Sequence, residues 1–147
     1  MMKRRFIYVI GALLLLTGCE FHASENGDLD GLWQLTQVDT LTTGGVEDMR
    51  YSQVSWAFQG HLMEMRKPLL FTYEGDILAR FDHTRDSLVV YDCYISKRDM
   101  GDIPVTKPED LYPYGLRRLT ERFRVMVLND SRMTLRSDSL QLYFRRY

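Results

Sequence analysis

The sequence predicts an all-β domain of about eight to ten short antiparallel strands, closed as a barrel or stacked as a sandwich. Three observations predict this fold class. Apolar and polar residues alternate with a period of two along most of the chain after residue 30, as in strands with one buried face. Turn-forming residues separate neighbouring runs at regular spacing. The connections are short, which favours antiparallel hairpins between successive strands.

The alternation is confined to short segments that we expect to be strands. They are residues 32–39, 51–58, 61–66, 69–73, 77–82, 87–95, 123–127, 133–135 and 140–144.

Residues 96–113 interrupt the pattern because they are polar and rich in Asp, Lys and Pro. We expect one short helix before the last three strands, formed by residues 109–111 or by residues 116–121. Such a helix would plug one end of a barrel.

The first 18 residues are expected to be an export signal. Three cations, Lys3, Arg4 and Arg5, precede an apolar run of 11 residues, 6–16. As a helix this run would span about 16 Å, whereas a bilayer core is about 30 Å thick. A basic start followed by a short apolar run is typical of a secretory signal. The alternative is an ordinary hydrophobic N-terminal helix followed by an incidental cysteine.

The end of the apolar run favours the signal. Leu16-Thr17-Gly18-Cys19 resembles the lipobox of bacterial lipoproteins. The resemblance implies cleavage before Cys19, a diacylglycerol on its sulfur, and a further acyl chain such as palmitate on the new N-terminus. Two or three chains anchor a protein stably. We therefore expect a lipid-anchored protein of the cell envelope, with the outer membrane as its expected location, that does not cross the bilayer.

Removing 18 of the 147 residues leaves 129, which suits one domain. We expect residues 19–30 to be a flexible polar tether and residues 31–147 to be the domain. The signal takes three of the 19 basic residues and no acid, so 16 basic residues face 20 acidic ones and the mature net charge is about −4. An acidic balance gives no reason to expect a nucleic-acid partner.

No residue pattern points to an enzyme, a cofactor or a metal. The histidines, His22, His61 and His83, lie in the tether or beside turns, without the paired spacing of a zinc site. With Cys19 lipidated, Cys93 is the only thiol left. It lies within a predicted strand, where a small buried hydrophobe is expected more often than a reactive group.

Gly31-Leu32-Trp33 opens the first predicted strand, and on this motif residues 29–147 resemble the lipocalin-like group of the calycins. In that group a Gly-x-Trp begins the first strand, the indole closes the barrel floor, and an arginine of the last strand packs over it. The resemblance implies an up-and-down barrel in which Arg145 or Arg146 covers Trp33. Arg146 shares the phase of the inward apolar residues of the last strand, whereas a bend at its end would favour Arg145. In typical lipocalins the main helix precedes one short strand, whereas the helix expected here precedes three strands. This arrangement resembles more closely the small lipocalin-like domains of bacterial lipoproteins.

Two functions follow as alternatives. The first is binding of a small apolar or amphipathic ligand inside the barrel, although the same side chains would also serve to fill a core. The candidate lining residues are Trp56, Phe58, Met63, Met65, Phe71, Tyr73 and Phe81.

The second is a protein-interaction module of an envelope complex, with a filled barrel and no ligand. Its basis is the tyrosine and arginine content of residues 111–124, because both residue types are favoured at protein contacts. An open apolar cavity would favour the first function, and a packed interior with an aromatic surface patch would favour the second.

Overall fold

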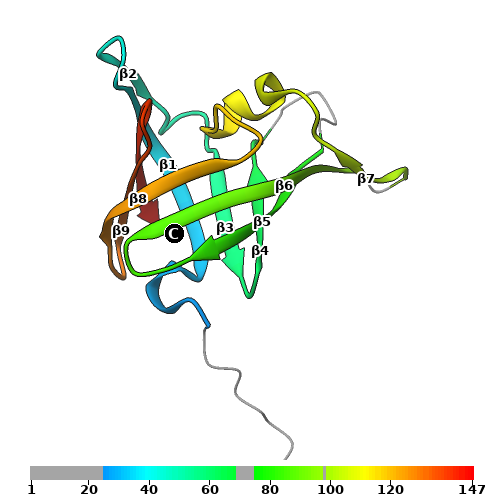
Figure 1. Cartoon of the computed structure of the whole chain (residues 1–147), viewed down its shortest axis with the longest axis horizontal. Coiled ribbons are helices and arrows are strands. Elements are labelled where there is room, and N and C mark those ends of the chain that lie inside the picture. Colours follow the sequence, from blue (N-terminus) through cyan, green and yellow to red (C-terminus); the bar gives the residue numbers. More distant parts are fainter. Residues whose placement is uncertain (1–24, 69–74, 98) are drawn as a thin grey trace, which may run out of the picture.

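The computed structural model describes residues 25–68, 75–97 and 99–147, and in them ten strands form one antiparallel sheet (Figure 1). The sheet closes into a barrel because β10 pairs with both β9 and β1. The elements are η2 (Gly27–Leu29), β1 (Gly31–Thr40), β2 (Gly45–Asp48), β3 (Ser55–Gln59), β4 (Leu62–Arg66), β5 (Ile77–His83), β6 (Ser87–Lys97), β7 (Gly101–Pro104), η3 (Pro108–Tyr114), β8 (Glu121–Leu128), β9 (Arg132–Arg136) and β10 (Leu140–Arg146).

The ring runs through β1, β3, β4, β5, β6, β8, β9 and β10, so the barrel and its up-and-down connectivity are confirmed. Strand β1 is long enough for two partners on one edge: residues 31–34 pair with β3 and residues 37–40 pair with β2. Strands β2 and β7 were not expected from the sequence. Their side chains are almost all exposed, so neither has the buried face that produces an alternating pattern.

The short helix before the last three strands is η3, a 3-10 helix. The alternative helix at residues 116–121 is wrong, because that stretch is irregular up to the start of β8 at Glu121. Gly115 ends η3 in a left-handed conformation, with φ of 94°. Leu111 and Tyr114 point inward and are buried, and the Trp56 indole donates to the Tyr114 carbonyl at 2.9 Å. Helix η3 therefore covers the upper end of the barrel (Figure 1).

The opposite end is closed by Trp33 and the short helix η2. Leu29 of η2 is fully buried, and the Trp33 indole donates to its carbonyl at 2.8 Å. The Asn26 side-chain amide donates to Asp30 at 2.6 Å and to the Gly60 carbonyl at 2.8 Å. Residues 26–30 of the expected tether therefore lie against the barrel floor, where Leu29 is buried.

Some expectations lie outside the described residues. They are the signal, the lipidated cysteine and tether residues 19–24, together with the strand expected at 69–73. Within the described part of the chain, no helix has the length and apolar character needed to cross a membrane.

Candidate functional site

The barrel interior holds most of the side chains that were expected to line a ligand cavity. Trp56 and Met65 are fully buried, and Met63, Phe58 and Phe81 are at most 2% exposed. Phe71 and Tyr73 lie outside the described residues. Interior cavities that admit water would leave measurable exposure on the side chains around them. These five side chains therefore belong to the packed core.

Aromatic rings make up much of this core. The Trp56 ring lies 4.8 Å from the ring of Phe144 and 6.2 Å from that of Phe123, centroid to centroid. Phe58 and Phe81 meet edge to face at 5.1 Å. Such distances are those of directly packed rings. Trp56 of β3 and Phe123 of β8 come from opposite sides of the ring, so these two rings meet across the barrel axis with no layer of ligand between them.

At the floor, the structure places Arg146 over Trp33. Its guanidinium carbon lies 4.8 Å from the centre of the indole, and Nη2 donates to the carbonyls of Asp28 at 2.7 Å and Asp30 at 2.6 Å. Gly31 has φ of 121°, which disfavours any other residue at the start of β1. Arg145 points to the outside of the barrel, where its Nε donates to Gln34.

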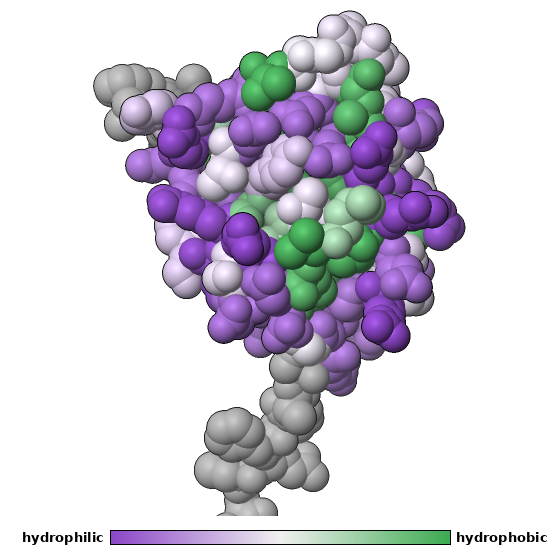
Figure 2. All heavy atoms as spheres, turned by 90° about the vertical axis from the view of Figure 1, so that its left-hand side faces the viewer, coloured by the Kyte–Doolittle hydropathy of each residue, from purple (hydrophilic) through white to green (hydrophobic). Residues whose placement is uncertain are grey.

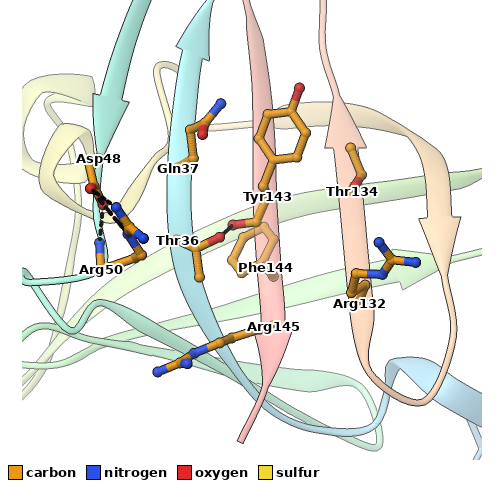
Figure 3. Close-up of a pocket in the computed structure, with 9 residues that line it drawn as sticks. All are labelled: Thr36, Gln37, Asp48, Arg50, Arg132, Thr134, Tyr143, Phe144 and Arg145. Carbon is orange, nitrogen blue, oxygen red and sulfur yellow. Dashed lines mark hydrogen bonds and ion pairs between the residues drawn. The ribbon is translucent and has the colours of Figure 1, made fainter.

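The outside of the barrel carries a polar hollow of about 550 Å³ across β1, β10 and β9, which we call the outer hollow (Figure 3). Figure 3 shows the Asp48–Arg50 pair on one side, Arg132 on the other and Arg145 at the lower edge. The lining residues are Thr36, Gln37, Asp48, Arg50, Arg132, Thr134, Tyr143, Phe144 and Arg145.

The register of β1, β10 and β9, together with one irregularity in β1, determines which side chains line the outer hollow. The register between β1 and β10 shifts between Leu35 and Gln37, so two consecutive residues, Thr36 and Gln37, line the same face. The Thr36 hydroxyl donates to the Tyr143 carbonyl at 2.9 Å across the irregular ladder. Beside them, β9 pairs Thr134 with Tyr143.

The charges in the outer hollow are only partly compensated. Arg50 makes a two-pronged contact with Asp48, at 2.9 and 2.6 Å, and this contact lowers the pKa of the Asp48 carboxyl to about 2. The Tyr143 hydroxyl donates to Asp39 at 3.0 Å; burial, followed by this carboxylate, raises its pKa. Arg132 and Arg145 form no ion pair with any described residue.

A second cleft, of about 380 Å³, lies at the upper end of the barrel between η3, β5 and β6. We call it the upper cleft. Its lining is mixed, with aliphatic and aromatic side chains beside two lysines and two acids. The lining residues are Lys67, Gly75, Ile77, Ile95, Lys97, Glu109, Asp110, Pro113 and Tyr114.

The sequence region proposed for protein contacts divides between core and surface. Leu111 and Tyr114 are buried under the barrel end, so they are not available to a partner. Tyr112 is 42% exposed, and the Arg117 guanidinium stacks on its ring at 4.6 Å. Arg118 pairs with Asp138 at 2.7 Å. The exposed aromatic content here is thus a single Tyr–Arg stack.

Cys93 and the two described histidines, His61 and His83, lie in different surroundings. Cys93 is 6% exposed, and burial, with a smaller effect of Asp92, raises its pKa to about 11. Burial also lowers the pKa of His83, while nearby Asp30 acts in the opposite direction. His61 lies on the surface, 3.5 Å from Glu25. Among the described residues, no three His, Cys, Asp or Glu side chains are grouped as metal ligands would be.

Sequence reasoning did not find the outer hollow, although part of the signal was present. The outward positions of the last three strands are rich in arginine, and the list of outward arginines is Arg122, Arg124, Arg132, Arg136 and Arg145. The alternation of apolar and polar residues along these strands predicts that such positions face outward. Only the register between strands shows which of them stand side by side.

Comparison with known proteins agrees with the barrel. The sequence model of a family described as lipocalin-like domain matches residues 14–147. A lipocalin-like protein from Bacteroides uniformis superposes with a TM-score of 0.60 at 21% identity, over 82% of this chain and 100% of that one. An uncharacterized protein from Bacteroides eggerthii also gives 0.60, at 15% identity, over 81% of this chain and 99% of that one. No curated protein sequence matches the chain.

Proposed function

The chain belongs to the lipocalin-like domain family, and we propose that it is a cell-envelope lipoprotein whose barrel recognises a partner with its outer surface. The observation that carries this proposal is the burial of the predicted cavity residues. All five that the structure describes are at most 2% exposed. A barrel filled in this way serves as a rigid scaffold, and its binding residues then lie on the outer faces of strands and in loops.

The proposed anchor is a lipid on Cys19, in the outer membrane. Its support is the basic start, the short apolar run and the sequence Leu16-Thr17-Gly18-Cys19. The chain enters the barrel through η2, at the end opposite η3 (Figure 1). In an anchored protein, the chain from residue 19 to residue 25 would therefore join the membrane to the closed floor and leave the sides of the barrel accessible.

Metabolic labelling with palmitate tests the anchor. We expect Cys19→Ser to abolish labelling and to move the protein from the membrane fraction to the soluble fraction. The matched control is Cys93→Ala, which alters the only other cysteine and should leave labelling and fractionation unchanged. Continued membrane fractionation of Cys19→Ser would overturn the anchor.

Native mass spectrometry of the lipidated protein tests the filled interior. We expect the mass of the lipidated chain alone, with no further apolar molecule bound in stoichiometric amount. Site-specific photocrosslinking in cells then tests the outer surface: a crosslinker at Thr134, in the outer hollow, should trap an envelope component. The control position is Leu62, which is 60% exposed on β4. Equal products from both positions would contradict recognition through the outer hollow.

The upper cleft supports a second candidate, binding of a small amphipathic ligand. Ile95, which is half-buried, and Pro113, which is exposed, offer an apolar wall, and Lys67 and Lys97 offer cationic groups for a polar head. The ligand would be of the class expected from the sequence, but it would bind in the upper cleft and not inside the barrel. Its test is a fatty-acid titration followed by native mass spectrometry. Ile95→Trp, which narrows the cleft, should abolish binding, whereas Val127→Trp on β8 should have no effect.

A further inference from the structure

We propose that the outer surface of the β8–β9 hairpin rests on the bilayer that holds the lipid anchor, with apolar side chains at the centre of the contact and arginines around them. The residues are Arg124, Met126, Val127, Arg132 and Arg136, and we call them the hairpin surface. This contact rests on the proposed function, because it identifies the envelope component that the outer surface recognises as a bilayer containing anionic phospholipid.

The apolar centre of the hairpin surface results from an irregularity in β8. The pairing of β8 with β9 shifts between Val125 and Val127. Met126 and Val127 are consecutive residues, yet they are 46% and 40% exposed. In a regular strand, one of two neighbouring side chains would point into the barrel. Figure 2 faces the left-hand side of Figure 1, where β8 and β9 lie, and shows an apolar area enclosed by hydrophilic surface.

Three arginines surround this apolar pair in the strand register. Val127 lies opposite the middle residue of β9, and Arg132 and Arg136 are the two ends of that strand, on the same face. Arg124 lies opposite Arg136 on β8. All three arginines are exposed, and none forms an ion pair with a described residue. The outward positions of the two strands carry no acid, because their one acidic residue, Glu121, is buried.

A bilayer suits this arrangement better than a single anionic ligand does. Its phosphate groups are spread over a plane, so the arginines need not converge on one group. Membrane binding by an amphipathic surface grows with the buried apolar area and with attraction to anionic lipids. Each arginine close to such a membrane strengthens binding about fivefold. Arginine stems can also cover apolar surface while the guanidinium groups stay in the polar layer. The hairpin surface offers both contributions.

The short connection to the anchor keeps the hairpin surface near the membrane. The chain from Cys19 to residue 25, where the described structure begins, can span at most about 20 Å. Arg146 joins the entrance of the chain to the β8–β9 turn, since its backbone N–H donates to the Ser131 carbonyl at 2.9 Å and its guanidinium donates to the Asp28 carbonyl at 2.7 Å. Membrane contact is therefore intramolecular in the anchored protein, so a surface of modest affinity is sufficient.

Quenching of a fluorescent label by lipid tests the contact in the lipidated, full-length protein. The label is attached at position 127 through Val127→Cys. The control is Leu62→Cys, because Leu62 is 60% exposed on β4, on another side of the ring. Cys93 is buried and does not compete for the label. In nanodiscs of phosphatidylglycerol and phosphatidylcholine that contain a doxyl-labelled lipid, we expect quenching at position 127 and little at position 62. Molar salt, which shortens the screening length to about 3 Å, should reduce the quenching.

Matched arginine variants of the labelled protein test the contribution of charge. Arg124→Gln and Arg132→Gln should each lower the ratio of contacting to free barrels about fivefold. The control is Arg80→Gln, because Arg80 is also exposed and outside the ion pairs of the described residues but lies on β5. It should change the ratio by less than about twofold. The salt series uses no arginine variant, so the test of charge does not depend on how these variants fold.

Three results would overturn the contact. Equal quenching at positions 127 and 62 would show that the barrel stands on its floor. Equal quenching at position 127 in nanodiscs of phosphatidylcholine alone would exclude a role for the arginines. No quenching at position 127 would exclude the bilayer as the partner, and a protein product from the photocrosslinker at Thr134 would then leave the proposed function standing. Failure of the wild-type chain to incorporate palmitate would instead refute the anchor, and with it the proposed function.

Discussion

Replacing Arg146 by alanine should open the floor of the barrel. The change removes a stack on Trp33, worth about 1 kcal/mol, and two charged hydrogen bonds to the carbonyls of Asp28 and Asp30, worth about 1 kcal/mol each in partly wet surroundings. We therefore expect the free energy of unfolding to fall by about 3 kcal/mol, measured by urea denaturation with tryptophan fluorescence. Hydrogen exchange of the Trp33 indole N–H should also accelerate, because η2 loses part of its attachment.

The neighbouring arginine is the control. Arg145→Ala removes one hydrogen bond to Gln34 from an exposed side chain, so we expect a cost of about 1 kcal/mol or less. Arg146→Lys keeps the charge and loses the two-carbonyl contact, which should place it between wild type and alanine. Equal costs for Arg145→Ala and Arg146→Ala, or a cost below about 0.5 kcal/mol for the latter, would refute the role assigned to the floor contact.

Two further predictions concern groups whose pKa is shifted. Cys93 is 6% exposed and its pKa is raised to about 11, so iodoacetamide should modify it far more slowly in the native protein than in urea at mildly alkaline pH; equal rates would contradict its burial. The pKa of His83 is lowered in the folded state, so on acidification the unfolded chain takes up a proton first and stability falls as pH drops below about 6.5 toward the folded pKa. The urea midpoint of His83→Gln should fall less steeply over this interval; parallel curves would show that another group controls the slope.

The strand pattern could be predicted wherever one face of a strand is buried. Trp56 and Phe58 alternate with less buried neighbours on β3, and the same holds for Ile77, Ala79 and Phe81 on β5. Alternation with a period of two arises when one face of a strand is buried. The side chains of strands β2 and β7 are almost all exposed, so these strands show no such alternation. Their existence follows from hydrogen bonds to β1 and β6.

The candidate sites could be predicted from the sequence less well than the strands. Large side chains on inward positions mark the interior, but their types are the same whether they line a cavity or fill it. The difference between a lined cavity and a filled core depends on ring-to-ring contacts across the barrel, such as Trp56 with Phe123. The outer hollow depends on residues about 100 positions apart in the chain, since Thr36 bonds to Tyr143 at a separation of 107 residues. No local pattern encodes such a pairing.

The sequence by itself determined the all-β class and the inward phase of most patterned strands. These two features are local, because alternation and turn chemistry act over a few residues. That an arginine of the last strand covers Trp33 came from the resemblance carried by Gly31-Leu32-Trp33. Tertiary structure decided that Arg146 and not Arg145 covers the indole, that the described interior is filled, and that Arg132 stands opposite Arg145 on the outside. Register between strands and packing across the barrel axis fix these outcomes, and both are properties of the closed ring rather than of any one segment.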